Sequence, residues 1–358
     1  MSDDGPDHGE QGRPARRGDA GEPVTGEVEM VVPEGVASTW EARHARGEVP
    51  GRWPYGLEWL ADARDLTVRL RGVGDPSRAR RVMTRVLPDH VGDAITGLAW
   101  DENLAHRMLT SRRYGQMHCG VIWANDRWEH LERRTREGLR RTLGRMASVW
   151  TLSQGQLDRF ELILPASTPR HFVRFGIDET FFTLAQYPDR PMVFSAGGDR
   201  DRDHATLLEA FSIVVAARPR VQAVLQTRER VRAPQGVQVV PHLSHLELRE
   251  MYRRASVVAV ATRPNLHVSG MTVSLEAQAT GRPVVLTDTA GTSDYVADGT
   301  TGFLVRGGSS SQLADRLIGL LDDAELAQRL GRQGRSAVEG MFTSRHLAER
   351  LLEATGLQ

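Results

Sequence analysis

Lysine is absent from the 358 residues of this chain, so all 46 of its basic side chains are arginine. This absence excludes a lysine Schiff base, a lysine nucleophile and the lysine of a phosphate-binding loop. Any phosphate group must instead be bound by arginine, by backbone amides or by a metal. Cysteine occurs once, at Cys119, which excludes an intramolecular disulfide and a cysteine zinc cluster and is consistent with a reducing cytoplasm.

Long apolar runs are also missing, since stretches such as 211–217 fall far short of the roughly 18 residues that span a bilayer. The acidic start of the chain is not followed by an apolar segment, so it does not resemble a secretory signal. Acidic and basic residues balance at 46 each, which removes the global positive field typical of nucleic-acid-binding proteins. We therefore expect no transmembrane segment, no nucleic-acid partner, and a cytoplasmic location, or one peripheral to the inner face of a membrane.

The length and the 40% hydrophobic content predict about two globular domains. Residues 1–26 are rich in Gly, Asp, Glu, Pro and Arg and are expected to form a disordered tail. An N-terminal domain is expected at 27–177, a linker containing Pro188 at 178–190, and a C-terminal domain at 191–342. A C-terminal helix at about 343–356 can pack back on the first domain.

Strand and helix patterns alternate along both domains, which predicts parallel sheets covered by helices on both faces. In the first half, the expected strands are 29–32, 66–70, 94–100, 119–123, 148–152 and 173–177. A long loop is expected from Trp40 to Trp53, followed by a helix from Pro54 to about Arg64. In the second half, strands are expected at 192–196, 223–226, 237–240, 257–261, 283–287 and 302–305. The fold class is therefore α/β, with two Rossmann-like doubly wound domains facing a cleft at the carboxyl ends of their strands.

The segment 267–285 predicts a loop, a helix, a glycine stop and a buried strand. Ser269 and Gly270 suit a helix entrance, where exposed amides at Gly270, Met271 and Thr272 would form a positive end suited to a diphosphate. Glu276 lies one turn or more further along the helix, where its carboxylate could accept hydrogen bonds from both hydroxyls of a ribose. An ordinary buried helix is the alternative interpretation.

The loop 197–203, Gly-Gly-Asp-Arg-Asp-Arg-Asp, follows a predicted strand and precedes a helix. Two guanidinium groups, those of Arg200 and Arg202, can bind pyrophosphate oxygens beside Gly198 and stabilise charge on a leaving group. The alternative is a solvated turn in which the arginines and aspartates pair with one another. No metal site is predicted.

Further candidates follow other strands. His242, in the loop after the strand at 237–240, could contact a nucleotide base, although a plain loop histidine fits as well. In the first half, two predicted strands end at Trp100 and Trp123, and the carboxylates of Asp101, Glu102 and Asp126 follow them. These side chains are expected to point into the cleft, where aromatic rings can stack on a ring-shaped ligand and carboxylates can bind its hydroxyls.

The C-terminal half resembles the nucleotide-binding domain of GT-B fold glycosyltransferases, in particular the retaining family-4 group. Leu275 to Val285 is similar to the family pattern Leu-Glu-Ala-(Met)-Ala-x-Gly-x-Pro-Val-Val, with Gln278 in place of Met. Asp294 stands where a Glu is usual in the later family pattern. That pattern is otherwise matched by Gly291, Val296, Asp298, Gly299, Gly302, Leu304 and Val305.

The resemblance implies transfer of a sugar from a UDP- or GDP-sugar to a hydroxyl of a saccharide, lipid-linked or small-molecule acceptor. It further implies retention of anomeric configuration, no metal and no other cofactor. Arg202 and Glu276 would hold the diphosphate and the ribose, with Arg200 replacing the family lysine. The acceptor would bind to the first half, near Trp100, Glu102, Trp123 and Asp126, with Asp101 nearest the acceptor hydroxyl. The family usually has a first Glu in the loop before Glu276, but counting back gives Val268, so His267 or Ser269 would take that place.

Two alternatives remain at this level. One is a nucleotide-sugar epimerase of the same fold, and the other is a non-catalytic partner subunit that binds a nucleotide sugar. An epimerase would interconvert the donor sugar without transferring it to an acceptor. A binding subunit would bind the nucleotide sugar but release no nucleotide diphosphate.

Overall fold

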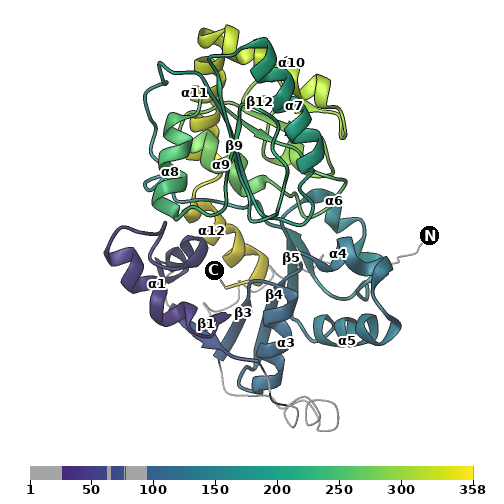
Figure 1. Ribbon diagram of the computed structural model, residues 1–358. Helices are drawn as coiled ribbons and strands as arrows, with labels where there is room; N and C mark the ends of the chain where they lie inside the picture. The colour runs from purple at the N-terminus through teal and green to yellow at the C-terminus, as the bar shows by residue number, and fades with distance from the viewer. Residues whose placement is uncertain (1–25, 63–65, 76, 78–94, 358) are drawn as a thin grey trace, which may run out of the picture.

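The computed structural model describes residues 26–62, 66–75, 77 and 95–357. The expected tail lies outside these residues except for its last position. Figure 1 shows two domains, one built from the N-terminal half and one from the C-terminal half, each with a central sheet flanked by helices. Among the described residues, no helix combines the length and apolar character needed to cross a membrane.

The N-terminal sheet has six parallel strands in the order β2-β1-β3-β4-β5-β6. The strands are β1 (Gly26–Pro33), β2 (Leu66–Val73), β3 (Ile95–Ala99), β4 (Gln116–Gly120), β5 (Ser148–Thr151) and β6 (Arg170–Phe172). Its helices are α1 (Val36–Ala45), α3 (Glu102–Ser111), α4 (Ala124–Arg127), α5 (Arg133–Leu143) and α6 (Gln154–Leu157), with 3-10 turns η1 (Pro54–Asp62), η2 (Trp128–His130) and η3 (Phe160–Leu162).

The C-terminal sheet is also six-stranded and parallel, in the order β12-β11-β10-β7-β8-β9. Its strands are β7 (Met192–Ala196), β8 (Gln222–Gln226), β9 (Val237–Val240), β10 (Val257–Val260), β11 (Val284–Thr287) and β12 (Gly302–Val305). Its helices are α7 (His204–Ala217), α8 (His245–Arg254), α9 (Met271–Ala279), α10 (Ser310–Asp322) and α11 (Ala324–Met341), with the 3-10 turn η4 (Thr292–Asp294). Continuous apolar strands such as β10 are buried on both faces because helices cover both sides.

The sequence-based element boundaries were wrong at several places in the first half. Helix α1 lies within the stretch expected to be a loop, and it buries none of its residues, so it leaves no amphipathic pattern in the sequence. The helix expected from Pro54 is a 3-10 segment interrupted at Tyr55 and Gly56, whose φ angles are 62° and 69°. The last strand, β6, ends before the predicted stretch at 173–177 begins.

Each sheet reverses its strand order at one point, between β1 and β3 in the first domain and between β10 and β7 in the second. Loops diverge at such points, so ligands of open α/β sheets bind there, beyond the carboxyl ends of the strands. In the C-terminal domain, the loops that flank this point are 197–203 after β7 and 261–270 after β10.

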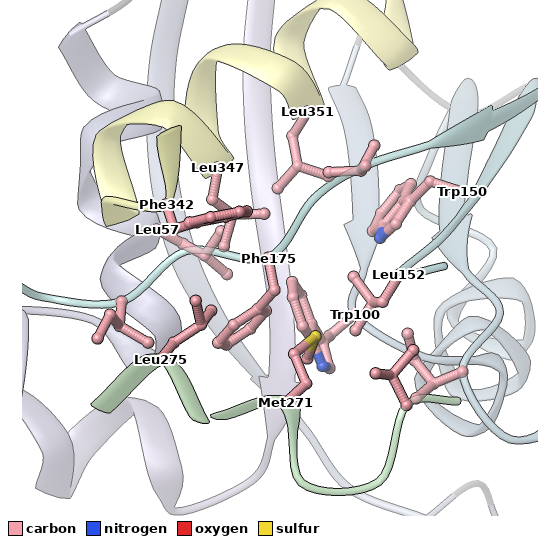
Figure 2. Close-up of a cluster of buried hydrophobic side chains, with 14 of the residues drawn as sticks. Leu57, Trp100, Trp150, Leu152, Phe175, Met271, Leu275, Phe342, Leu347 and Leu351 are labelled. Atoms are coloured by element: carbon pink, nitrogen blue, oxygen red, sulfur yellow. The ribbon is translucent and has the colours of Figure 1, made fainter. Parts of the chain in front are cut away.

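The two domains share one hydrophobic core. Trp100 and Phe175 of the first domain belong to the same buried cluster as Met271 and Leu275 of α9. Figure 2 shows these side chains together with residues of α12 (Ser344–Thr355), the last helix of the chain. Helix α12 packs against η1 and β5 of the N-terminal domain, so the end of the chain ties the two domains together (Figure 1).

Candidate functional site

The loops after β7 and β10 are held against each other at the switch point of the C-terminal domain. Arg202 and Thr262 form an isolated antiparallel bridge between the two loops. The amide of Asp203 donates to the carbonyl of Ala261 at 2.9 Å, and the amide of Arg263 donates to the carbonyl of Asp201 at 2.8 Å. These backbone bonds place the side chain of Arg202 beneath the loop that leads into α9.

The guanidinium group of Arg202 is buried but incompletely bonded. The residue is 6% exposed, and its Nε and Nη1 atoms have no hydrogen-bond partner. A Cβ atom at Gly197 would lie 2.5 Å from its Nη2, and one at Gly270 would lie 2.8 Å from its Nη1. Both glycines also have positive φ angles, 138° and 96°, which a side chain would disfavour. The chain therefore reserves space around a buried cation whose donors are free, and an anion is the natural partner for such a group.

Helix α9 begins beside this cation. Gly270 occupies its N-cap, and no side chain caps the helix. The amide of Met271 donates to the carbonyl of Val268 at 3.0 Å, so the expectation that this amide is exposed was wrong. The Met271 side chain lies in the shared core, as Figure 2 shows. Every residue of α9 is buried except Thr272 and Glu276, which are one turn apart and form a single accessible stripe.

Glu276 is fixed by a buried tyrosine. The hydroxyl of Tyr252, from the C-terminal part of α8, donates to Oε2 of Glu276 at 2.7 Å. Burial raises the pKa of Glu276 to about 7, although the Tyr252 hydrogen bond and the charge of Arg202 act to lower it. Burial lowers the pKa of Arg202, while Asp199, Tyr252 and Glu276 raise it. Arg202 and Glu276 therefore influence each other electrostatically, as neighbours in one crevice.

A charged cluster joins the two domains at the other side of this loop. Nδ1 of His267 lies 2.7 Å from Oδ2 of Asp126, which belongs to α4 of the N-terminal domain. Nε2 of His267 lies 3.2 Å from Oδ2 of Asp199. The carboxylate of Asp126 also accepts from the backbone amides of Leu266 at 2.6 Å and His267 at 3.1 Å. The oxygen Oδ1 of Asp199 accepts from the hydroxyl of Ser269 at 3.1 Å.

The histidine of this cluster is an imidazolium at neutral pH. Burial acts to lower the pKa of His267, but the hydrogen bonds to Asp126 and Asp199 and their charges raise it to about 9. The pKa of the Asp199 carboxyl is lowered, because burial is outweighed by the His267 hydrogen bond and by nearby positive charge. The ring of Trp123 lies 4.7 Å from that of His267.

These contacts place several predicted residues together. The guanidinium of Arg202 lies beside Gly270, and the charge of Glu276 acts on it. His267 contacts Asp126 and Trp123, and both His267 and Ser269 bond to Asp199. Arg200 is exposed, pairs with Asp201 at 3.0 Å, and has its guanidinium carbon 5.9 Å from the Trp123 ring centre.

Other predicted residues lie elsewhere or are already engaged. His242 is exposed at the end of β9 and lies 3.0 Å from Nη2 of Arg228. Gly198 is exposed, with open space around it. Glu102 is buried and accepts from the amides of Ile122 and Trp123, both at 3.0 Å, so its carboxylate ties the segment after β4 to the start of α3. Burial raises its pKa to about 7.

Trp100 and Asp101 sit at the carboxyl end of β3. Trp100 is 7% exposed and lies beneath the ring of Tyr55, so it does not present a free face to a ligand. Oδ1 of Asp101 accepts from the amides of Asn103 and Leu104, both at 2.9 Å, and caps α3. The proximity of Asp101 to an acceptor stays a prediction.

The sequence analysis missed one pattern in the loop after β7. Asp199 and Asp201 form an Asp-x-Asp pair, and their ligand atoms lie within 4.8 Å of that of His267. This spacing could hold a cation. Both ring nitrogens of His267 face carboxylates, however, so the histidine acts as a hydrogen-bond donor rather than as the neutral imidazole that binds a metal. Tyr252 was also missed, because a buried tyrosine at the end of a helix gives no signal in the sequence.

Two cavities lie near these groups. One of about 890 Å³ runs between α3 and α5 and includes Asp101 in its lining. The other, of about 420 Å³, lies between the domains, and Asp126, Thr262 and Thr289 line it. Neither is lined by Arg202 or Glu276.

Residues 191–323 match the family model described as glycosyl transferases group 1. This segment is a group 1 glycosyltransferase domain. It contains Arg202, Glu276 and the loop that carries His267.

Relatives of this glycosyltransferase domain are found among curated proteins. D-inositol 3-phosphate glycosyltransferase of Nocardia farcinica is 36% identical over 135 residues, which cover 38% of this chain and 29% of that protein. A protein of Corynebacterium glutamicum, named GDP-mannose-dependent monoacylated alpha-(1-6)-phosphatidylinositol monomannoside mannosyltransferase, is 28% identical over 245 residues. That match covers 61% of this chain and 64% of the relative. The chain thus spans less than two thirds of the length of these relatives.

Solved structures confirm the fold. HepE of Anabaena in complex with UDP-glucose superposes with a TM-score of 0.65 at 14% identity, over 93% of this chain and 100% of that one. Sucrose-phosphate synthase of Thermosynechococcus elongatus superposes with a TM-score of 0.64 at 15% identity, over 92% and 98% of the two chains. The expected GT-B architecture, two Rossmann-like domains facing each other, is therefore confirmed.

Proposed function

We propose that this chain transfers a sugar from a nucleotide-diphosphate sugar to an acceptor hydroxyl, with retention of anomeric configuration. The single observation that carries the proposal is the buried guanidinium of Arg202, with two unpartnered nitrogens beside the uncapped start of α9. A positive helix end and a free guanidinium together form a site for a diphosphate. Both groups would also stabilise the charge that grows on a departing diphosphate.

The neighbouring residues extend this site in two directions. Glu276, held by Tyr252, lies one turn beyond the start of α9 and can accept hydrogen bonds from ribose hydroxyls. In the other direction, the amide of Gly197 donates to Oε1 of Gln226, and the Gln226 amide donates to the carbonyl of Pro241. The end of β9, where His242 is exposed, is thereby linked to the diphosphate loop. We propose that the base lies along this edge and that the donor is a UDP- or GDP-sugar, with no other cofactor.

Sugar and acceptor would lie toward the N-terminal domain, near His267. We further propose that the departing diphosphate accepts the proton of the acceptor hydroxyl. The bond from the anomeric carbon to the diphosphate oxygen breaks as the bond to the acceptor oxygen forms on the same face.

One observation favours the alternative of a binding protein without transfer. Val268, which stands where the family pattern places its first Glu, is 2% exposed, and the ring nitrogens of His267 are both engaged by carboxylates. A chain of this kind would bind nucleotide diphosphates and release none from a nucleotide sugar.

Calorimetric titration with UDP and GDP, followed by turnover of their sugars, tests both possibilities. We expect Arg202→Ala to weaken nucleotide binding about 10- to 100-fold, because a hydrogen bond to a charged group contributes about 1.5–3 kcal/mol. Arg232→Ala, at an exposed arginine of the same domain, is the matched control and should bind as the wild type does. Equal dissociation constants for Arg202→Ala and the wild type would contradict the proposal.

Turnover then separates the reaction classes. Release of UDP or GDP together with a glycosylated product supports transfer, and the anomeric proton of that product reports retention. Binding without release supports the partner-subunit alternative. Interconversion of the donor sugar without an acceptor supports an epimerase.

A further inference from the structure

Tyr55 has an unusual backbone and an unusual position. Its φ and ψ angles are 62° and 13°, in the left-handed region that a bulky side chain rarely adopts. Yet its ring is ordered by packing: it lies 4.3 Å from the ring of Trp100 at an interplanar angle of 17°, and meets Phe175 edge-on at 5.9 Å. One face of Tyr55 is therefore stacked, and the residue remains 45% exposed.

The segment around Tyr55 is built to hold this conformation. The carboxylate of Glu58 accepts from the amides of Arg52 and Trp53, at 2.5 and 3.0 Å. The amide of Gly51 donates to Asp178 at 2.8 Å, which anchors the segment to the interdomain connection. Gly56 packs so tightly on Ser344 of α12 that a Cβ atom would clash. Strain that the surroundings enforce in this way points to a function for the strained residue.

The location of Tyr55 indicates what that function is. Trp100 follows β3 and so lies at the switch point of the N-terminal sheet, where open α/β sheets bind their ligands. Figure 2 shows Trp100 next to Met271, the first residue of α9, whose accessible stripe carries Thr272 and Glu276. Tyr55 thus stands on the acceptor side of the crevice, across from the proposed donor site.

A carboxylate lies beside this aromatic pair. Asp101 follows Trp100 directly, and its Oδ1 caps α3, whereas its Oδ2 accepts no hydrogen bond from the described residues. Partial burial and the charge of Asp101 raise the pKa of Tyr55 to about 12, so the Tyr55 hydroxyl remains a proton donor.

We propose that Tyr55 and Asp101 form the acceptor subsite, and that it takes a polyhydroxylated ring, either a saccharide or a cyclitol. The exposed face of the Tyr55 ring would stack on the C–H face of the acceptor ring. Oδ2 of Asp101 would accept a hydrogen bond from one of the acceptor's hydroxyls. The inference rests on the proposed function for the reaction that this acceptor undergoes, but the binding itself can be measured without turnover.

The test is saturation-transfer NMR on the full chain with three probes: myo-inositol, methyl α-D-glucopyranoside and methyl α-D-mannopyranoside, each with UDP or GDP present. Tyr55→Gly removes the ring and tolerates the positive φ angle, whereas Tyr55→Phe keeps the ring. Trp59→Ala is the matched control, because Trp59 is 38% exposed in the same segment and its ring faces Arg345 instead.

We expect at least one probe to bind the wild type, Tyr55→Phe and Trp59→Ala, and to bind Tyr55→Gly at least tenfold more weakly. Asp101→Asn should weaken the same probe. If no probe binds the wild type, or if Tyr55→Gly binds it equally, the subsite is refuted. If the proposed function is wrong, the result is different: the wild type binds neither UDP nor GDP.

Discussion

The interdomain bond between His267 and Asp126 should make the stability of this protein depend on pH in the alkaline range. The pKa of His267 is raised from 6.5 to about 9 in the folded chain. A shift of about 2.5 units corresponds to about 3 kcal/mol, since each unit is worth about 1.36 kcal/mol. Because the folded pKa is the higher one, this stabilisation is complete below pH 6.5 and is lost as the pH rises through 9.

The substitution Asp126→Asn removes one of the two carboxylates that His267 contacts directly, and Asp199 remains. We expect the pH-dependent part of the unfolding free energy to fall by roughly half, by about 1.5 kcal/mol between pH 6.5 and 9.5. Asp294→Asn is the control, because its carboxylate also crosses between the domains, to the amide of Gln154 at 3.1 Å, without a histidine. Its pH dependence should equal that of the wild type.

Urea denaturation followed by tryptophan fluorescence at several pH values measures this difference. The groups that surround His267, namely Asp201, Arg200 and Arg202, are the same in both variants, so their contributions largely cancel. An NMR titration of the His267 ring, assigned with His267→Gln, gives the pKa directly. A His267 pKa near 6.5, or an Asp126→Asn variant with the wild-type pH dependence, would refute the reasoning.

Two further predictions concern the donor side. Because the pKa of Glu276 is raised to about 7, nucleotide-sugar binding should weaken as the pH falls below 7. Tyr252→Phe should raise the pH at which binding is half lost, because the Tyr252 hydrogen bond lowers the Glu276 pKa. If calorimetric titrations find that pH unchanged, Glu276 does not contact the donor. Gly270→Ala should destabilise the fold by about 1–3 kcal/mol and weaken UDP or GDP binding, since its methyl group would meet Arg202. Gly299→Ala is the control, because Gly299 has a φ of 71° and open space around it, so nucleotide binding should stay intact. Equal nucleotide affinities for Gly270→Ala and Gly299→Ala would contradict the crowding of Arg202 by a methyl group at Gly270.

Much of the C-terminal domain was predictable because its signals are local. Strands such as β7 and β12 have the predicted boundaries, since buried parallel strands read as continuous apolar runs. The Leu275–Val285 pattern identified the family, and the family model that matches 191–323 confirms it. In the N-terminal domain, α1 was missed because it shows no apolar periodicity, whereas η1 occupies the stretch predicted as a helix but is a 3-10 segment.

The sequence by itself determined the order of strands in the C-terminal domain, the fold class, and the exclusion of lysine and disulfide chemistry. Those properties follow from residue types and short-range spacing. Only the tertiary structure decided that Asp126 reaches His267 across 141 positions, that Tyr252 holds Glu276, and that Tyr55 is exposed while Trp100 is buried. Such contacts depend on how separate loops are brought together at the sheet edges, and no local pattern in the chain encodes that arrangement.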